Sequence, residues 1–231
     1  MASDNQPMRE LILSSRCILN SRFIDSNTRE VLYSTRTPKG RFSRDSVTTI
    51  TRHTPSTNQP CGSKSDPPPI PQSASPNLPE KVAPPPNYTP ESKQEPTDGG
   101  NEIEITKIRW KFFDDTLFEH DSRTENVNQI IKKSGLRPLR FNRTFDVNGV
   151  SYKWDLGLVG FDTPTLKLND RTEAVVAKFH RAYPFTRAKP TLELRQGFED
   201  ILDTIVMTLV WAEWRQMLGM SIVIPIMILF L

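Results

Sequence analysis

The C-terminal segment Phe198–Leu231 constrains the fold more than any other part of this chain. It is the only long stretch patterned as a helix, whereas the rest of the chain is patterned as short strands. Apolar residues occupy almost every side of this helix between Ile201 and Trp214, so it has to be buried in protein or in lipid. No charged residue follows Arg215. The environment of this segment therefore decides whether the chain is a soluble domain or a membrane-attached one.

We assign residues 198–216 to a protein interior, because the charged residues Asp203, Glu213 and Arg215 lie near the ends of the helix. Residues 216–231 are uncharged and would be about 24 Å long as a helix at 1.5 Å per residue. A membrane span needs about 20 residues, and Pro225 would weaken a helix there. The tail 217–231 is thus a short anchor, a strip packed on the domain, or sequence outside the native product. Its apolar character favours a weak membrane attachment.

Composition divides the rest of the chain into segments. Thirteen of the 20 prolines fall between residues 55 and 96, and such a stretch cannot bury enough apolar surface to fold. We therefore expect N-terminal strands in residues 1–53, a disordered Pro-rich insert in 54–100, and further strands with the core helix in 101–216.

Charge and cysteine usage narrow the function class. The formal net charge of +3 is too small to indicate nucleic-acid binding. Only two cysteines are present, Cys17 and Cys61, which fits a reducing compartment. The first residues lack the layout of a signal peptide, so a cytoplasmic location is expected. We find no sequence motif for a metal or a cofactor.

Alternating apolar residues and turn signals predict a mainly β domain. Asn148-Gly149 is a strong two-residue turn signal, and the resulting hairpin places Phe145 opposite Tyr152 and Arg143 opposite Trp154. A change of phase near Thr106-Lys107 predicts a β-bulge or a break between two strands. The other expected strands are Glu10–Ser15, Arg22–Asp25, Val31–Thr35, Ser46–His53, Leu166–Leu168, Glu173–His180 and Thr191–Leu194.

Eight short motifs occur in a fixed order along the chain. They are Phe23-Ile24-Asp25, Val31-Leu32-Tyr33, Thr48-Thr49-Ile50, Ile108-Arg109-Trp110, Arg143-Thr144-Phe145, Asn148-Gly149, Tyr152-Lys153-Trp154 and Glu213-Trp214-Arg215. Together they resemble an uncharacterised domain family abundant in mushroom-forming fungi, which is similar in layout to the tubby-like barrels that include the phospholipid scramblases. The resemblance implies a closed β-barrel around one hydrophobic C-terminal helix, and it implies no established activity.

A proline motif in the insert is a candidate binding site for a WW domain. Pro85-Pro86-Asn87-Tyr88 has the form Pro-Pro-x-Tyr. The prolines Pro85 and Pro86 favour a polyproline II conformation, and Tyr88 would fill a groove of the partner.

Basic residues beside two leucines form a candidate lipid-contact cluster. Lys132, Lys133, Arg137 and Arg140 could face an anionic membrane surface, where each basic residue contributes about 1 kcal/mol. The simpler interpretation is a solvated loop.

No residue pattern indicates a reaction. Trp110, Tyr152 and Trp154 could line a ligand pocket, but aromatic residues on alternating strand positions are more typical of a core. We expect a non-catalytic intracellular binding module of unknown ligand, associated with lipid or a membrane. The alternatives are an adaptor that recruits a WW-domain ubiquitin ligase through Pro85, Pro86 and Tyr88, and an enzyme with an unrecognised site.

Overall fold

The computed structural model describes residues 8–38, 46–54, 101–111, 116–120, 122–134, 142–157, 162–182 and 186–228, with side chains up to Met217. All of them belong to one compact unit, formed by residues 1–55 and 101–231. The motif at Pro85, Pro86 and Tyr88, Arg137 and Arg140, and nearly all of the expected insert lie outside the described residues.

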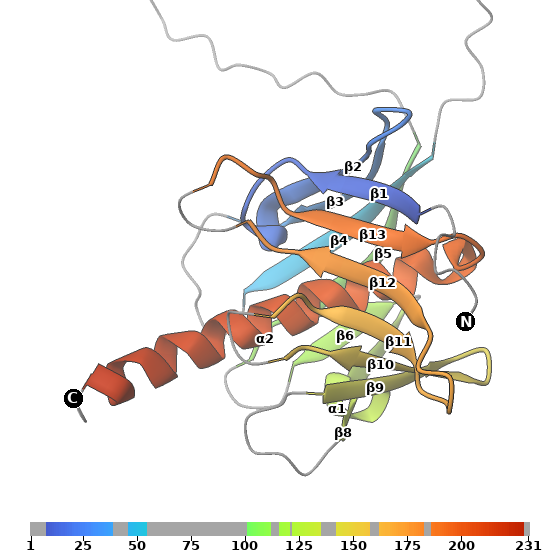
Figure 1. Cartoon of the computed structure of the whole chain (residues 1–231). Coiled ribbons are helices and arrows are strands. Elements are labelled where there is room, and N and C mark those ends of the chain that lie inside the picture. Colours follow the sequence, from blue (N-terminus) through green and yellow to red (C-terminus); the bar gives the residue numbers. More distant parts are fainter. Residues whose placement is uncertain are drawn as a thin grey trace, which may run out of the picture. The chain divides into compact units, whose positions relative to one another are not determined.

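The described chain is mainly β, with one antiparallel sheet of 13 strands and one long C-terminal helix (Figure 1). The strands are β1 (Met8–Leu13), β2 (Ser21–Asp25), β3 (Val31–Arg36), β4 (Val47–Thr54), β5 (Asn101–Arg109), β6 (Leu117–His120), β7 (Arg123–Asn126), β8 (Lys132–Ser134), β9 (Asn142–Val147), β10 (Val150–Asp155), β11 (Thr165–Leu168), β12 (Val175–His180) and β13 (Thr191–Arg195). The helical elements are η1 (Ile18–Asn20), α1 (Val127–Ile130), η2 (Glu199–Ile201) and α2 (Leu202–Ile228).

The strands follow one another round the sheet in a circular order. From β1 to β7 and from β8 to β13 each strand pairs with the next one along the chain. Because β1 also pairs with β13, the sheet begins at β7 and ends at β8. Only the helical turn α1 separates these two end strands along the chain. Within the described part of the chain no ladder joins β7 to β8, so the expected closed barrel is wrong at this seam.

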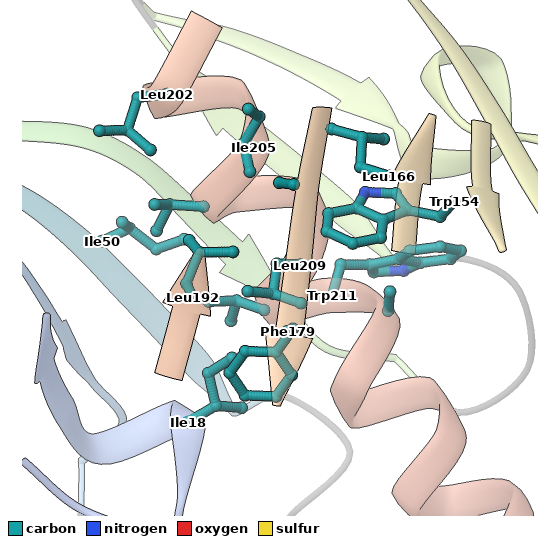
Figure 2. Packing of buried hydrophobic residues seen from close by; sticks show 14 of the residues in the cluster. Ile18, Ile50, Trp154, Leu166, Phe179, Leu192, Leu202, Ile205, Leu209 and Trp211 are labelled. Carbon is teal, nitrogen blue, oxygen red and sulfur yellow. The ribbon is translucent and has the colours of Figure 1, made fainter. Parts of the chain in front are cut away.

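Helix α2 forms the centre of the core. Ile205, Val206 and every residue from Thr208 to Trp214 are buried. Because successive residues of a helix are about 100° apart, such a run covers its whole circumference. Figure 2 shows the strand residues Trp154, Leu166, Phe179 and Leu192 packed among Ile205, Leu209 and Trp211 of α2. The prediction of an interior helix is therefore confirmed from Ile201 to Gln216, whereas Glu199 and Asp200 at the start of the predicted range are exposed.

A buried hydrogen bond in the middle of α2 links the helix to the sheet. The Trp154 indole Nε1 donates a hydrogen bond of 3.0 Å to the Thr208 hydroxyl in the middle of the helix. Both side chains are fully buried. Removing the Thr208 hydroxyl would leave the buried Trp154 Nε1 without this hydrogen bond, which costs about 1–3 kcal/mol. The Thr208 hydroxyl itself also donates to the Thr204 carbonyl of its own helix, at 2.8 Å.

The predicted hairpin at Asn148-Gly149 is confirmed, including its register. Phe145 pairs with Tyr152 and Arg143 with Trp154. The backbone has φ of 51° at Asn148 and 78° at Gly149, as a type I′ turn requires.

The predicted β-bulge is also confirmed, one residue from the expected position. β5 is a single strand in which Thr106 pairs with Ile50 and Glu104 with Thr51. Ile105 is consequently the extra residue. β4 and β5 pair along their full length, from Val47–Arg109 to Thr54–Asn101, although residues 55–100 separate them in the sequence.

Helix α2 continues beyond residue 216, where the segment with the core helix was expected to end. It passes Pro225 and reaches Ile228, leaving the sheet toward the C-terminus (Figure 1). Within the described residues, neither α2 nor any shorter helix combines the length and the hydropathy that a membrane span requires.

Candidate functional site

A cleft of about 640 Å³ lies between the first residues of α2 and the β5–β7 end of the sheet. We call it the α2–β7 cleft. Its lining comes from six elements in two distant stretches of the chain, residues 105–130 and 200–207, and it combines apolar with charged side chains. The lining residues are Ile105, Phe118, His120, Arg123, Glu125, Ile130, Asp200, Asp203, Thr204 and Met207.

The sheet side of the cleft has charged residues where a core would have apolar ones. Phe118 in β6 is buried and pairs with Glu125 in β7, and His120 pairs with Arg123. Directly paired residues of an antiparallel ladder lie on the same face, and residues two apart in a strand also share a face. Arg123 and Glu125 therefore point to the inner face of the sheet, yet both are exposed. The inner face is open to solvent here.

The helix side of the cleft is a stripe that the sheet does not cover. Thr204 and Met207 are half-buried, in contrast to the fully buried residues that follow. With Asp200 they are spaced four and three residues apart, which places them on one face. β7 cannot cover this stripe because all of its residues are polar. The cleft is thus the part of the interior that α2 and the sheet leave unfilled.

Asp203 lines one side of the cleft and links α2 to two strands. Its Oδ1 accepts a hydrogen bond of 2.7 Å from the Tyr33 hydroxyl of β3, and its Oδ2 lies 2.8 Å from Nη1 of Arg52 in β4. Tyr33 is only 4% exposed. Burial, together with the hydrogen bond to the Asp203 carboxylate, raises the pKa of Tyr33 well above its ordinary value.

The other charged groups of the cleft remain available to a ligand. Within the described part of the chain, the side chains of Arg123, Glu125 and Asp200 have no hydrogen bond or ion pair. Two carboxylates and one guanidinium, without a partner among the described residues, therefore surround an apolar floor formed by Ile105, Phe118, Ile130 and Met207.

A second polar cluster lies farther along α2, outside the cleft lining. Arg181, just after β12, donates from Nε and Nη2 to the Glu213 carboxylate at 2.6–3.1 Å. Arg181 also donates to the side-chain oxygen of Gln216, whose Nε2 donates to the Leu156 carbonyl at 2.8 Å. Burial raises the pKa of Glu213, and the Arg181 guanidinium opposes that rise. Here Glu213 and Gln216 of α2 are satisfied by partners outside the helix, Arg181 and the Leu156 carbonyl.

The predicted lipid-contact cluster is only partly described. Lys132 and Lys133 are exposed in β8, a strand where the sequence predicted a loop. Lys132 lies 3.9 Å from the carboxylate of Asp146 in β9. Arg143, which belongs to the same basic stretch, is buried, and its guanidinium lies 5.6 Å from the ring centre of Trp211.

The aromatic residues weighed as a pocket belong to the core. Trp110, Tyr152 and Trp154 are all buried, and none lines the α2–β7 cleft. The indole of Trp110 donates a hydrogen bond of 2.7 Å to the Thr48 hydroxyl. In the described ranges no group of three or more His, Cys, Asp or Glu residues is placed to hold a metal ion. Binding of a WW domain at Pro85, Pro86 and Tyr88 remains a prediction.

Sequence reasoning missed the residues of the cleft. Elements β6, β7, α1 and β8 were not expected. For β7 the reason is that Arg123–Asn126 contains no apolar residue that could alternate. One signal was present: Asn126 is an N-cap residue whose side chain accepts a hydrogen bond from the Asn128 backbone amide at 2.9 Å.

Comparisons with known proteins give a family but no activity. No curated protein and no solved structure matches the chain. A family model, described as a family of unknown function (DUF6593), matches residues 16–217. The match covers η1, the strands β2 to β13, and α2 as far as Met217, its last described side chain. The chain therefore belongs to DUF6593, and the prediction of an uncharacterised domain family is confirmed.

Proposed function

We propose that this protein is a non-catalytic binding module that holds a ligand with an apolar body in the α2–β7 cleft. The observation that carries this proposal is the cleft itself, an open part of the interior with an apolar floor and a charged rim. Its volume of about 640 Å³ lies within the roughly 300–1,000 Å³ typical of small-molecule sites.

The placement of polar groups supports binding over catalysis. A catalytic carboxylic acid is commonly tuned by burial or by a charged partner. The carboxyl group whose pKa burial raises, Glu213, is paired with Arg181 and does not line the cleft. The free carboxylates of the cleft, Glu125 and Asp200, belong to exposed residues, which suits recognition of a polar ligand end.

Calorimetry with dodecyl maltoside below its critical micelle concentration tests this proposal. We expect saturable binding to the full chain, and we expect Thr204→Trp to reduce the affinity at least tenfold because the indole fills the cleft. Ile130→Trp, from the α1 side, should act in the same way. Val150→Trp is the matched control, because Val150 is 43% exposed in the hairpin and outside the lining.

Two results would contradict the proposal. One is the absence of saturable binding to the full chain. The other is unchanged binding by both cleft-filling variants whose thermal unfolding still matches that of Val150→Trp.

We also propose that the fold is a tubby-like barrel with an incomplete seam. The circular order of the strands, the pairing of β1 with β13 and the burial of α2 on all sides support this relationship. In this view α1 bridges the position where a closed barrel would have a ladder between β7 and β8.

A second candidate function is attachment to a membrane through the C-terminal part of α2. The supporting observation is that α2 remains helical from Gln216 to Ile228, in sequence that has no charge after Arg215. Flotation with neutral phosphatidylcholine vesicles should recover the full chain and should not recover a version ending at Gln216. Equal recovery of the two would contradict it.

A further inference from the structure

We propose that the α2–β7 cleft selects a single-chain zwitterionic amphiphile, which is a molecule with one apolar chain and a head that bears a cation and an anion. The inference rests on the proposed function, since it names the ligand class of the same cleft. It follows from the charges of the rim, from the apolar floor and from the state of Asp203.

The first step concerns the signs of the rim charges. Arg123 and Glu125 come from β7, and Asp200 comes from η2 on the helix side. Their side chains lack partners within the described residues. A ligand of one charge sign would satisfy one type of group and bring a like charge close to the other. A zwitterionic head satisfies both, so the rim discriminates by repulsion as well as by attraction.

The second step excludes Asp203 from the free charge of the cleft. Both of its carboxylate oxygens are engaged, one by the Tyr33 hydroxyl and one by Arg52. The charges left for a ligand are therefore those of Glu125, Asp200 and Arg123. With two carboxylates against one guanidinium, the rim attracts the cationic part of a head more strongly than the anionic part.

The third step concerns the floor. Phe118 is 2% exposed, and Ile105, Ile130 and Met207 are half-buried around it. Four apolar side chains from different elements offer a surface for an alkyl chain, and each methylene that they bury improves affinity about fourfold. The cleft thus has a floor for the chain and a rim of both signs for the head.

A series of amphiphiles with the same dodecyl chain tests this inference by calorimetry below each critical micelle concentration. The heads are phosphocholine, trimethylammonium, maltoside and sulfate. We expect affinity to fall in that order, with dodecylphosphocholine bound at least tenfold more tightly than dodecyl maltoside.

Charge-neutralising variants should change this order in opposite ways. The double variant Glu125→Gln with Asp200→Asn should weaken dodecyltrimethylammonium and dodecylphosphocholine at least fivefold and should strengthen dodecyl sulfate. Arg123→Gln should weaken dodecylphosphocholine and dodecyl sulfate and should strengthen dodecyltrimethylammonium. Asp146→Asn is the matched control, because this exposed carboxylate on β9 is outside the cleft lining and should leave all four affinities unchanged.

The outcomes separate the inference from the proposed function. If the four amphiphiles bind equally and Thr204→Trp and Ile130→Trp block all of them, the headgroup inference is wrong and the cleft remains a binding site. If none binds saturably, or if both cleft-filling variants bind as the full chain does, the inference and the proposed function are both wrong. A preference for one head that the charge variants do not alter would also overturn the inference.

Discussion

The two ends of the buried part of α2 use polar residues in opposite ways. Around Glu213 the polar groups are enclosed and satisfied by Arg181, Gln216 and the Leu156 carbonyl. At the first turn, Asp203 is anchored by Tyr33 and Arg52. Around it the cleft leaves Arg123, Glu125 and Asp200 exposed. Glu213 and Gln216 at the C-terminal end therefore contribute to stability. At the N-terminal end Asp203 does so too, whereas Arg123, Glu125 and Asp200 stay available to a ligand.

This difference arises from how completely the sheet surrounds the helix. The strands β9 to β13 contribute buried apolar residues, such as Phe145 and Trp154, to the core around α2. β7 has only polar residues and cannot do so. Burial favours a protein partner for charged and amide groups such as Glu213 and Gln216 on the covered part of α2, whereas a polar group on the uncovered part can use water until a ligand arrives.

The largest effect should come from breaking the enclosed cluster with Glu213→Ala. Arg181 has a side chain only 19% exposed and would lose its carboxylate partner, and breaking a buried ion pair in this way typically costs about 3–5 kcal/mol. Urea unfolding followed by tryptophan fluorescence measures the change.

The matched control for that prediction replaces the whole pair. Glu213→Leu with Arg181→Met leaves no buried charge, and we expect it to recover most of the lost free energy of unfolding. A double variant no more stable than Glu213→Ala would mean that the pair is not what holds this end of the helix.

A smaller loss is expected from Gly157→Ala, beside the same cluster. Gly157 has φ of 63°, and an added Cβ would collide with the side chain of Asp162. Leu156 and Asp162 supply carbonyls to Gln216 and Arg181, so the displacement would reach the enclosed cluster. We expect a loss of about 1–3 kcal/mol in the free energy of unfolding, measured by thermal and urea unfolding.

Gly149→Ala provides the comparison for Gly157. Gly149 also has positive φ, but an added Cβ there would meet no atom within 4 Å. Backbone strain alone should cost about 1 kcal/mol. Equal losses for the two variants would show that the contact with Asp162 is unimportant.

The stabilisation that Tyr33 and Asp203 provide at the N-terminal end of α2 should decrease at alkaline pH. The pKa of Tyr33 is raised by burial and by Asp203, so above about pH 10 the unfolded chain releases this proton and the folded chain keeps it. The folded state then binds more protons than the unfolded state, and stability falls as pH rises, by up to about 1.4 kcal/mol per pH unit. Below that pH the stabilisation is fully present.

Tyr33→Phe removes this pH dependence. Near pH 8 it should cost about 1 kcal/mol, because one hydrogen bond to Asp203 is lost. By pH 11 the difference from the full chain should shrink or reverse, since phenylalanine does not ionise. Urea unfolding at both pH values measures it, and a constant difference would show that Tyr33 does not titrate as the buried hydroxyl suggests.

The contrast between the two ends also explains what could be predicted from the sequence. The hairpin at Asn148-Gly149, its register and the interior position of α2 were correct, because each depends on turn chemistry or on burial, which imposes a pattern. The bulge in β5 was visible for the same reason: Ile103 and Ile108 lie in different phases of the strand.

The cleft could not be predicted by the same reasoning. Strand patterns are recognised by alternation between a buried and a solvated face. Arg123 and Glu125 face inward but remain exposed, so β7 shows no alternation and was missed. A strand that borders an open part of the interior has no buried face, so it lacks the alternation by which strands are recognised in a sequence.

The smallest effect on stability should come from the charges of the cleft. Arg123→Gln and Glu125→Gln should change the free energy of unfolding by less than about 0.5 kcal/mol, because neither side chain has a partner among the described residues. Urea unfolding without a ligand measures this, with Asp146→Asn as the exposed control. A loss above about 1 kcal/mol in either variant, beyond the ordinary range for surface changes, would show that these residues support the fold. Charged residues at both ends of α2 would then contribute to the free energy of unfolding, only by different amounts. A neutral result, beside the large loss for Glu213→Ala, would mean that stability does not account for charged residues at the inner face of β7, as expected if they serve binding.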